Sequence, residues 1–305
     1  MTDNQTEQFI VKLKLYVRAS YPLLWVQTHE ETRVINDIAL AFDSLKIPIP
    51  VYAWDVQQEL RKYQKSNDDK KINWLQIPQP LTPPKTDIMG IIKYCSMLPR
   101  IGNGRTLIII KDFHPYIEVA QQVRAIRNLV DTAHAADQTY IFVSPVIKIP
   151  IELEKDFQLL DYKLPNDAQL GQILQSLTKD FIAAYPANEE IHSVPRAIEL
   201  DIIEACKGMT FAESYDACAL AAATHGKFNS QFVSTVFEEK IKQVKRHGFI
   251  QYLKPTDTFD SIGGLSELKT WIKVRAKAYT EEARKYGLKY PRGILLAGIP
   301  GTGNI

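Results

Sequence analysis

The sequence predicts an α/β fold in which a mostly parallel sheet is covered on both faces and is followed by a helical bundle. Three observations lead to this prediction. Short, fully apolar runs alternate with helical patterns up to residue 165, as in parallel sheets that are buried on both faces. After Pro165, helical patterns follow one another without further strands. A glycine-rich turn behind one more apolar run, near residue 300, indicates the start of another domain.

The predicted strands are apolar runs rich in β-branched and aromatic residues, which favour strands. They cover residues 23–26, 49–54, 107–110, 140–143 and 159–164. Helical patterns lie between them at residues 29–45, 87–98 and 117–136. A charged loop is expected at residues 66–71, and a proline-rich bend at residues 78–84.

The second part of the chain is predicted to be helical. Its helices are expected at residues 167–185, 195–207, 211–224 and 230–247. Gly208 suits the end of one helix, and Thr210 with Glu213 three residues later predicts a capping box at the start of the next. We therefore expect an α/β module over 1–165, a helical bundle over 166–247, a linker over 248–256 and a further domain over 257–305.

Composition is ordinary for a globular protein, and several function classes find no support in it. The net charge is +2, with 45% hydrophobic and 24% charged residues, so no membrane partner is expected and nucleic acid is a weak candidate. Cys95, Cys206 and Cys218 have no metal-site or disulfide spacing, which predicts buried thiols in a reducing compartment. The histidines show no metal-binding spacing, and no apolar run is long enough to cross a bilayer.

The glycine-rich turn has the spacing of a phosphate-binding loop. Residues Gly298 to Gly303 follow the apolar run 294–297 and read G-x-x-x-x-G. Such glycines let backbone N–H groups cradle phosphate oxygens at the start of a helix. The next two residues are normally Lys, which neutralises phosphates, and Ser or Thr, which holds Mg²⁺. Here Asn304 and Ile305 stand at those positions.

A second motif lies upstream of this turn. The segment Phe259-Asp260-Ser261-Ile262-Gly263-Gly264-Leu265 precedes a helical pattern, and Pro291-Arg292-Gly293 then leads into the apolar run. In order and spacing, residues 256–305 resemble the AAA family of ATPases. The resemblance implies that the adenine would lie against Asp260, Ile262, Gly263 and Gly264. It implies that the phosphates would be wrapped by Gly298, Pro300, Gly301, Thr302 and Gly303.

The same resemblance implies a function. Family members bind ATP and Mg²⁺ and hydrolyse ATP to remodel a protein partner, often as a homo-oligomeric ring. Within the family, the chain resembles a divergent branch encoded by cyanobacteria and algal plastid genomes, which implies a cytoplasmic or plastid stromal protein.

The chain departs from the family pattern at its end. Asn304 and Ile305 replace the Lys and the Ser or Thr, and no positions follow for the Walker B carboxylates, the sensor or the arginine finger. We therefore expect an incomplete AAA ATPase domain, cut by a shifted reading frame, a broken gene or a deliberate boundary, with no catalytic residues and no ATP hydrolysis. The alternative is a non-enzymatic interaction or regulatory module over residues 1–250. A nucleic-acid helper is a third possibility, suggested by the basic stretch 240–247.

The first 250 residues resemble a degenerate copy of the same P-loop-like AAA module with its helical lid. Residues 107–112 resemble a Walker B strand ending in Asp112, although a strand-end turn residue explains Asp112 as well. The turn after the first strand, residues 27–31, has neither glycine nor lysine. A capping box between Thr28 and Glu31 is expected there, and carboxylates at a helix start repel phosphate. This copy is therefore not expected to bind ATP.

Two smaller expectations concern charged and polar side chains. Lys111 with Arg124 and Arg127 is a candidate basic face, although charges on helices are usually only solvated. Ser266 is expected to cap the helix that follows the glycine pair.

Overall fold

The structure is a computed structural model that describes residues 5–65, 72–77, 88–98, 104–184, 193–246, 263–280, 283 and 286–289. The chain divides into two compact units, residues 1–243 and 244–305. The larger unit contains a sheet with its covering helices and a helical bundle, and the described residues of the smaller unit include a short helix with a 3₁₀ turn.

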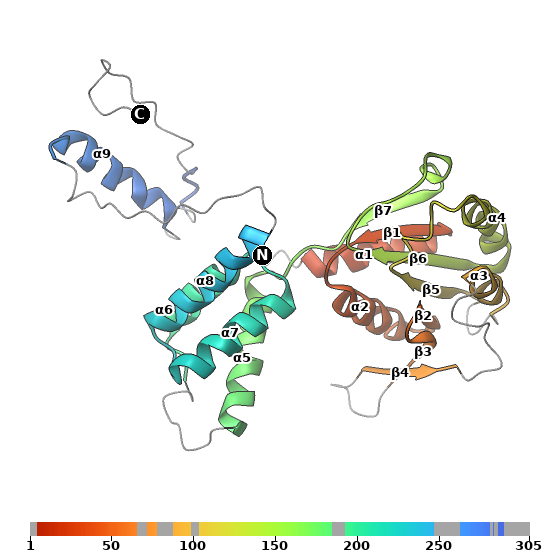
Figure 1. Cartoon of the computed structure of the whole chain (residues 1–305), viewed down its shortest axis with the longest axis horizontal. Coiled ribbons are helices and arrows are strands. Elements are labelled where there is room, and N and C mark those ends of the chain that lie inside the picture. Colours follow the sequence, from red (N-terminus) through yellow and green to blue (C-terminus); the bar gives the residue numbers. More distant parts are fainter. Residues whose placement is uncertain are drawn as a thin grey trace, which may run out of the picture. The chain divides into compact units, whose positions relative to one another are not determined.

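A seven-stranded sheet forms the centre of the first half of the larger unit, with the order β4-β3-β2-β5-β6-β1-β7 (Figure 1). Its parallel part consists of β1 (Leu23–Gln27), β2 (Val51–Asp55), β5 (Thr106–Lys111), β6 (Gln138–Ser144) and β7 (Phe157–Asp161). The antiparallel strands β3 (Glu59–Lys65) and β4 (Ile72–Gln76) extend one edge. In the centre of the sheet, Leu24 pairs with Ile141 on β6 and with Gln158 on β7.

Helices cover both faces of this sheet. One face packs against α1 (Gln5–Arg18) and α2 (Glu31–Asp43), and the other packs against α3 (Ile88–Ser96) and α4 (Ala120–Ala136). A short 3₁₀ helix, η1 (Ile151–Leu153), lies between β6 and β7. Successive side chains of a strand point to opposite faces, so both faces of β1 are apolar. Leu23 and Trp25 join one core cluster, whereas Leu24 and Val26 join the other.

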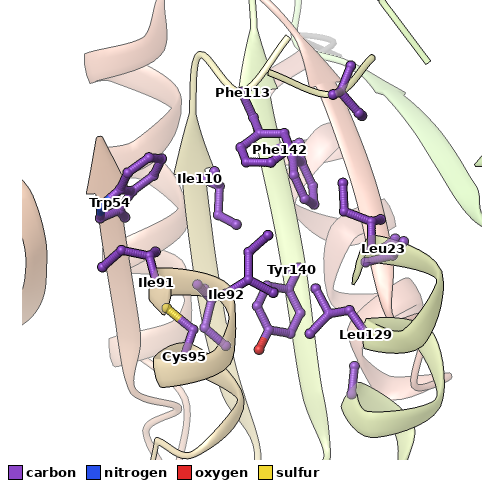
Figure 2. Packing of buried hydrophobic residues seen from close by; sticks show 14 of the residues in the cluster. Leu23, Trp54, Ile91, Ile92, Cys95, Ile110, Phe113, Leu129, Tyr140 and Phe142 are labelled. Atoms are coloured by element: carbon purple, nitrogen blue, oxygen red, sulfur yellow. The ribbon is translucent and has the colours of Figure 1, made fainter. Parts of the chain in front are cut away.

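Figure 2 shows the first of these clusters from close by. Ile91, Ile92 and Cys95 of α3 and Leu129 of α4 pack onto side chains from the strands of the sheet. Among these strand residues, Trp54, Tyr140 and Phe142 are almost completely buried. The continuous apolar runs of the sequence therefore have the predicted cause, a parallel sheet covered on both faces.

The helical bundle follows the sheet along the chain. It consists of α5 (Asp167–Ala184), α6 (Arg196–Cys206), α7 (Phe211–His225) and α8 (Ser230–Arg246). Its own core includes Leu174, Leu177 and Phe232. The predicted capping box is confirmed: Thr210 Oγ1 accepts from the Glu213 N–H at 3.2 Å, and the Glu213 carboxylate accepts from the Thr210 N–H at 2.8 Å.

Two elements of the first module were not predicted from the sequence. Among the described side chains of helix α1, Phe9, Leu13 and Val17 are buried, and the apolar residues Val11 and Leu15 between them are exposed, so the buried stripe does not stand out in the sequence. The hairpin β3–β4 is largely solvent-facing and carries many charged and polar residues. The last strand is also displaced, since residues 157–161 form β7 instead of 159–164.

The smaller unit contains α9 (Ser266–Ala276) and η3 (Lys277–Tyr279). The prediction that Ser266 caps this helix is wrong. Ser266 is the first helical residue, and Leu265 occupies the N-cap position without a side-chain hydrogen bond. No residue of α9 is buried, and the guanidinium of Arg275 lies 4.5 Å above the ring of Trp271.

Candidate functional site

The candidate site lies where β1 ends and α2 begins. Strand β1 is flanked by β6 and β7, and all three strands run parallel, so their carboxyl ends meet at one edge. The chain leaves β1 through α2 on one face, whereas α4 connects β5 to β6 on the other face. In open parallel sheets, ligands bind at the carboxyl edge where the connections diverge in this way.

The turn between β1 and α2 is held by Thr28. Its N–H donates to the carbonyl of Ser144 at 3.0 Å, which ties the turn to the end of β6. Its hydroxyl accepts from the N–H of Glu30 at 3.0 Å, two residues on. The predicted capping box between Thr28 and Glu31 is therefore wrong, because Glu30 is the N-cap of α2 and makes no side-chain cap bond to this helix. Short hydroxyl-to-backbone bonds of this kind compete with helix caps.

The carboxylate of Glu30 is the central group of the site. Its side chain is only 4% exposed. One oxygen, Oε1, accepts from the backbone N–H of Phe211, the first residue of α7. The other oxygen, Oε2, pairs with the guanidinium of Arg33. Free N–H groups at a helix start attract anions, and here the chain supplies its own anion to α7.

Arg33 connects this carboxylate to three further elements. Its Nη2 donates to Gln169 Oε1 of α5 at 2.9 Å and to Thr6 Oγ1 of α1 at 3.2 Å. The guanidinium lies 4.9 Å from the ring centre of Tyr162, just after β7. The resulting network joins the sheet module to α5 and α7 of the helical bundle. We call Glu30, Arg33, Thr6, Gln169 and Phe211 the Glu30 network.

Tyr162 is itself anchored in this region. Its hydroxyl donates to Asp37 Oδ2 of α2 at 2.5 Å. Burial, together with the neighbouring carboxylate of Asp37, raises the pKa of Tyr162 above its usual range. Tyr162 therefore stays neutral and serves as a fixed platform for Arg33 at physiological pH.

A second charged cluster lies at the ends of β2 and β5. Lys111 Nζ is 2.7 Å from Asp55 Oδ2 and 3.1 Å from Glu31 Oε1. Burial raises the pKa of Asp55, but hydrogen bonds from Lys111 and from the N–H groups of Gln57 and Gln58 outweigh it and hold the pKa below its usual value. The cation nearest the sheet edge is therefore already neutralised by two carboxylates.

The surroundings of Asp112 among the described residues are unlike those of a catalytic carboxylate. Its φ of 47° places it in the left-handed region, and its side chain is 55% exposed. His114 Nδ1 lies 3.8 Å from Asp112 Oδ1 and also contacts Ser144 Oγ at 2.8 Å. The interpretation of Asp112 as a turn residue at the strand end is favoured over a Walker B role.

The candidate basic face finds no support in the described residues. Arg124 and Arg127 line a hollow together with Glu118 and Glu152. Lys111 is instead paired with Asp55 and Glu31 at the sheet edge.

A cavity of about 420 Å³ opens beside Glu30. It is lined by residues 29–33 and Asn36 on one side and by residues 210–212 on the other. Two features of this cavity disfavour a nucleotide phosphate. The helix-start N–H of Phe211 is already bonded to Glu30, and no described glycine or lysine lines the cavity.

The residues predicted to bind nucleotide lie elsewhere in the chain. Gly263 and Gly264 are described; both are exposed, and Gly264 has a φ of 68°, which suits glycine. The remaining predicted residues, Asp260, Ile262, Gly298, Pro300, Gly301, Thr302 and Gly303, lie outside the described residues. The predicted adenine and phosphate site therefore stays a prediction.

The described residues contain no group of three or more His, Cys, Asp or Glu side chains that could hold a metal ion. They also contain no helix that is both long and apolar enough to span a bilayer.

Comparison with known proteins identifies relatives for most of the chain. Residues 9–162 match the family model for the N-terminal domain of SpoVK-like AAA ATPases. Residues 168–247 match the model for the second domain of the same proteins. The two matched segments adjoin where the sheet module passes into the helical bundle.

Curated relatives match almost the whole chain. An uncharacterized AAA domain-containing protein, ycf46, of Guillardia theta is 28% identical over 295 residues, covering 97% of this chain and 53% of its own length. The protein of the same name from Trieres chinensis is 25% identical over 300 residues, covering 97% of this chain and 54% of its own length. The chain thus spans about half the length of the curated relatives it matches.

Solved structures with a related arrangement were also found. Caenorhabditis elegans PCH-2 aligns with a TM-score of 0.48 and 11% identity, covering 81% of this chain and 70% of that one. Domain III of the Thermotoga maritima replication initiation protein DnaA aligns with a TM-score of 0.46 and 11% identity, covering 79% of this chain and 94% of that one.

Proposed function

Since the chain belongs to the SpoVK-like AAA ATPases, we propose that residues 5–246 are a nucleotide-free AAA-like module with an interaction or regulatory role. ATP chemistry would then belong to the domain that begins near residue 257. In a longer protein this second domain would bind ATP and Mg²⁺ and hydrolyse ATP to remodel a protein partner.

The observation that supports this proposal most strongly is the position of the Glu30 carboxylate. Bound phosphate needs free N–H donors and net positive charge at the helix start. At this site three groups that could bind phosphate have acidic partners: Phe211 N–H and Arg33 bond to Glu30, and Lys111 bonds to Asp55 and Glu31. A phosphate would have to displace a buried carboxylate and would leave it unpaired, which costs several kcal/mol.

A fixed internal anion also supports a structural role for the module. In an ATP-binding module, the contact between the sheet and the helical lid depends on the nucleotide. Here the side chains of Glu30, Arg33 and Gln169 make that contact together with the backbone N–H of Phe211. The module would therefore keep one shape throughout the cycle of a neighbouring ATPase domain, as expected of a docking or regulatory element.

Nucleotide contacts in the second domain are part of this proposal. Asp260, Ile262, Gly263 and Gly264 would lie against adenine, and Gly298 to Gly303 would wrap the phosphates. Asn304 and Ile305, at the Lys and Ser or Thr positions, would weaken phosphate and Mg²⁺ binding and leave this chain without ATP hydrolysis. A homo-oligomeric ring and a cytoplasmic or stromal location are proposed for the longer protein.

Equilibrium titration of the full chain with Mg-ATP tests where nucleotide binds. We expect any measured affinity to be unchanged in Arg33→Ala, because Arg33 serves Glu30 and not phosphate. The matched control is Arg196→Ala, which removes an exposed, locally paired arginine of α6. A tenfold or larger loss of affinity in Arg33→Ala alone, in a chain that remains folded by circular dichroism, would show that the first module binds nucleotide.

A further inference from the structure

The helical bundle holds two cysteine side chains in direct contact. Cys206 is the last residue of α6, and Cys218 lies in the middle of α7. Their sulfur atoms are 3.7 Å apart, and the two residues are 3% and 2% exposed. A disulfide requires a sulfur–sulfur distance of about 2.0 Å, so the two sulfur atoms would have to move closer together. We call these two residues the thiol pair.

The surroundings of the thiol pair distinguish its two members. The hydrogen bond from Cys218 is the main cause that holds the pKa of Cys206 below its usual value, against the effect of burial. The buried hydroxyl of Ser214 and the charge of Lys240 act in the same direction as Cys218. The same hydrogen bond, with burial, raises the pKa of Cys218. Cys206 is therefore the first of the pair to ionise, and the thiolate is the reactive form.

We propose that Cys206 and Cys218 form a redox site that a hydroperoxide oxidises to an internal disulfide. The Cys206 thiolate attacks one peroxide oxygen, the O–O bond breaks, and hydroxide or alkoxide leaves, so that Cys206 becomes a sulfenic acid. The Cys218 thiol then attacks the Cys206 sulfur, the S–O bond breaks, and one water leaves with the Cys218 proton. The peroxide is reduced by two electrons, and the two thiols are oxidised by two.

The disulfide would act on the corner between α6 and α7. It closes a loop that contains residues 207–217, including the capping box of Thr210 and the N–H of Phe211. Phe211 is the point at which α7 reaches the Glu30 carboxylate. Oxidation would therefore stiffen the turn that positions this contact, and reduction would release it.

Cys95 provides a contrast within the same chain. It is completely buried on α3, under the sheet. Burial raises the pKa of Cys95 to about 12, so it stays protonated. No described cysteine contacts it, and it has no partner for a disulfide among the described residues.

Peroxide treatment of the folded full chain, followed by mass analysis, tests the proposal. We expect the chain to lose the mass of two hydrogen atoms and to keep one free thiol, which maps to Cys95. Lys207 lies between Cys206 and Cys218 in the sequence. Tryptic cleavage after Lys207 should therefore give two peptides that stay joined by the disulfide until it is reduced. The oxidised chain should also unfold at a temperature a few degrees higher, because the link constrains the unfolded state.

Single substitutions provide the controls. Cys206→Ser and Cys218→Ser should abolish the joined peptides, whereas Cys95→Ala should retain them. The proposal is overturned if the folded wild-type chain keeps three free thiols under conditions that oxidise the urea-unfolded chain. It is equally overturned if the joined peptides contain Cys95. Because both outcomes are read on the wild-type chain, they hold even if a serine variant fails to fold.

Discussion

Glu30 is a buried acid whose two oxygens serve different parts of the chain. One oxygen holds the start of α7, and the other holds Arg33, which in turn reaches α1 and α5. A residue with this many long-range partners acts as a link between the sheet and the bundle. The local sequence did not show this, because the partners of Glu30 and Arg33 include residues more than a hundred positions away.

Glu30→Ala should lower the free energy of unfolding by about 2 to 4 kcal/mol, because it leaves Arg33 and the Phe211 N–H short of a partner. Urea denaturation measures the change. The matched control, Glu31→Ala, removes a partly exposed neighbour that only pairs with Lys111, and it should cost less than about 1 kcal/mol. Equal losses in both variants would show that Glu30 is not the link described above.

Asp55 should contribute stability that depends on pH. Its pKa in the folded chain lies below the ordinary value, so its contribution is present above the pKa of the unfolded chain, near pH 4, and is lost as the pH falls through the folded pKa. The free energy of unfolding of Asp55→Asn should therefore fall less steeply than that of the wild-type chain between about pH 5 and pH 3. Unfolding free energies measured across this range check the prediction, and parallel curves for both proteins would refute it.

Predictions from the sequence succeeded for single residues when the interaction was local. Thr210 and Glu213 are three positions apart, and their capping box formed as predicted. Thr28 and Glu31 have the same spacing but formed no box, because the Thr28 hydroxyl bonds to the nearer N–H of Glu30. Glu31 then pairs with Lys111, which is far away in the chain. Spacing alone cannot decide between such competing partners.

Helix α7 depends on its first turn. Thr210→Ala removes the side-chain acceptor of the cap and should cost about 1 kcal/mol. The matched control on the same helix is Thr224→Ala, which removes an exposed hydroxyl that bonds only to the Leu220 carbonyl; it should be nearly neutral. Urea denaturation of both variants gives the comparison, and a neutral Thr210→Ala would contradict the role of the cap.

Helix α1 shows why some elements escaped prediction. Its buried stripe is a single row, so its pattern is weak in the sequence, yet Leu13 is completely buried against the sheet. Leu13→Ala should cost about 2 to 5 kcal/mol through lost burial and a cavity. The control Leu15→Ala, at a residue that is 57% exposed, should cost less than about 1 kcal/mol. Thermal unfolding ranks the two, and similar midpoints would mean that α1 does not pack as described.

Across the whole molecule, the α/β class and the order of sheet then helices were predictable because apolar runs such as 107–110 and 140–143 are short and rich in β-branched and aromatic residues, which favours buried strands. The hairpin β3–β4 was not predictable, since its residues are polar and it is defined by pairing with β2. For the candidate site, the sequence predicted only that the turn after the first strand would bind phosphate poorly, because it lacks glycine and lysine. The identity of the internal anion, Glu30, required the tertiary contact to Phe211.

The central claim is that Glu30 occupies the anion position of the first module. Backbone amide NMR of the full chain, with and without saturating Mg-ATP, tests it most directly. We expect the Phe211 amide signal to stay unchanged with nucleotide and to move in Glu30→Gln, which weakens its acceptor. A Phe211 signal that shifts with Mg-ATP in the wild-type chain, and no longer does so in Arg33→Ala, would place the nucleotide in this module and contradict the claim.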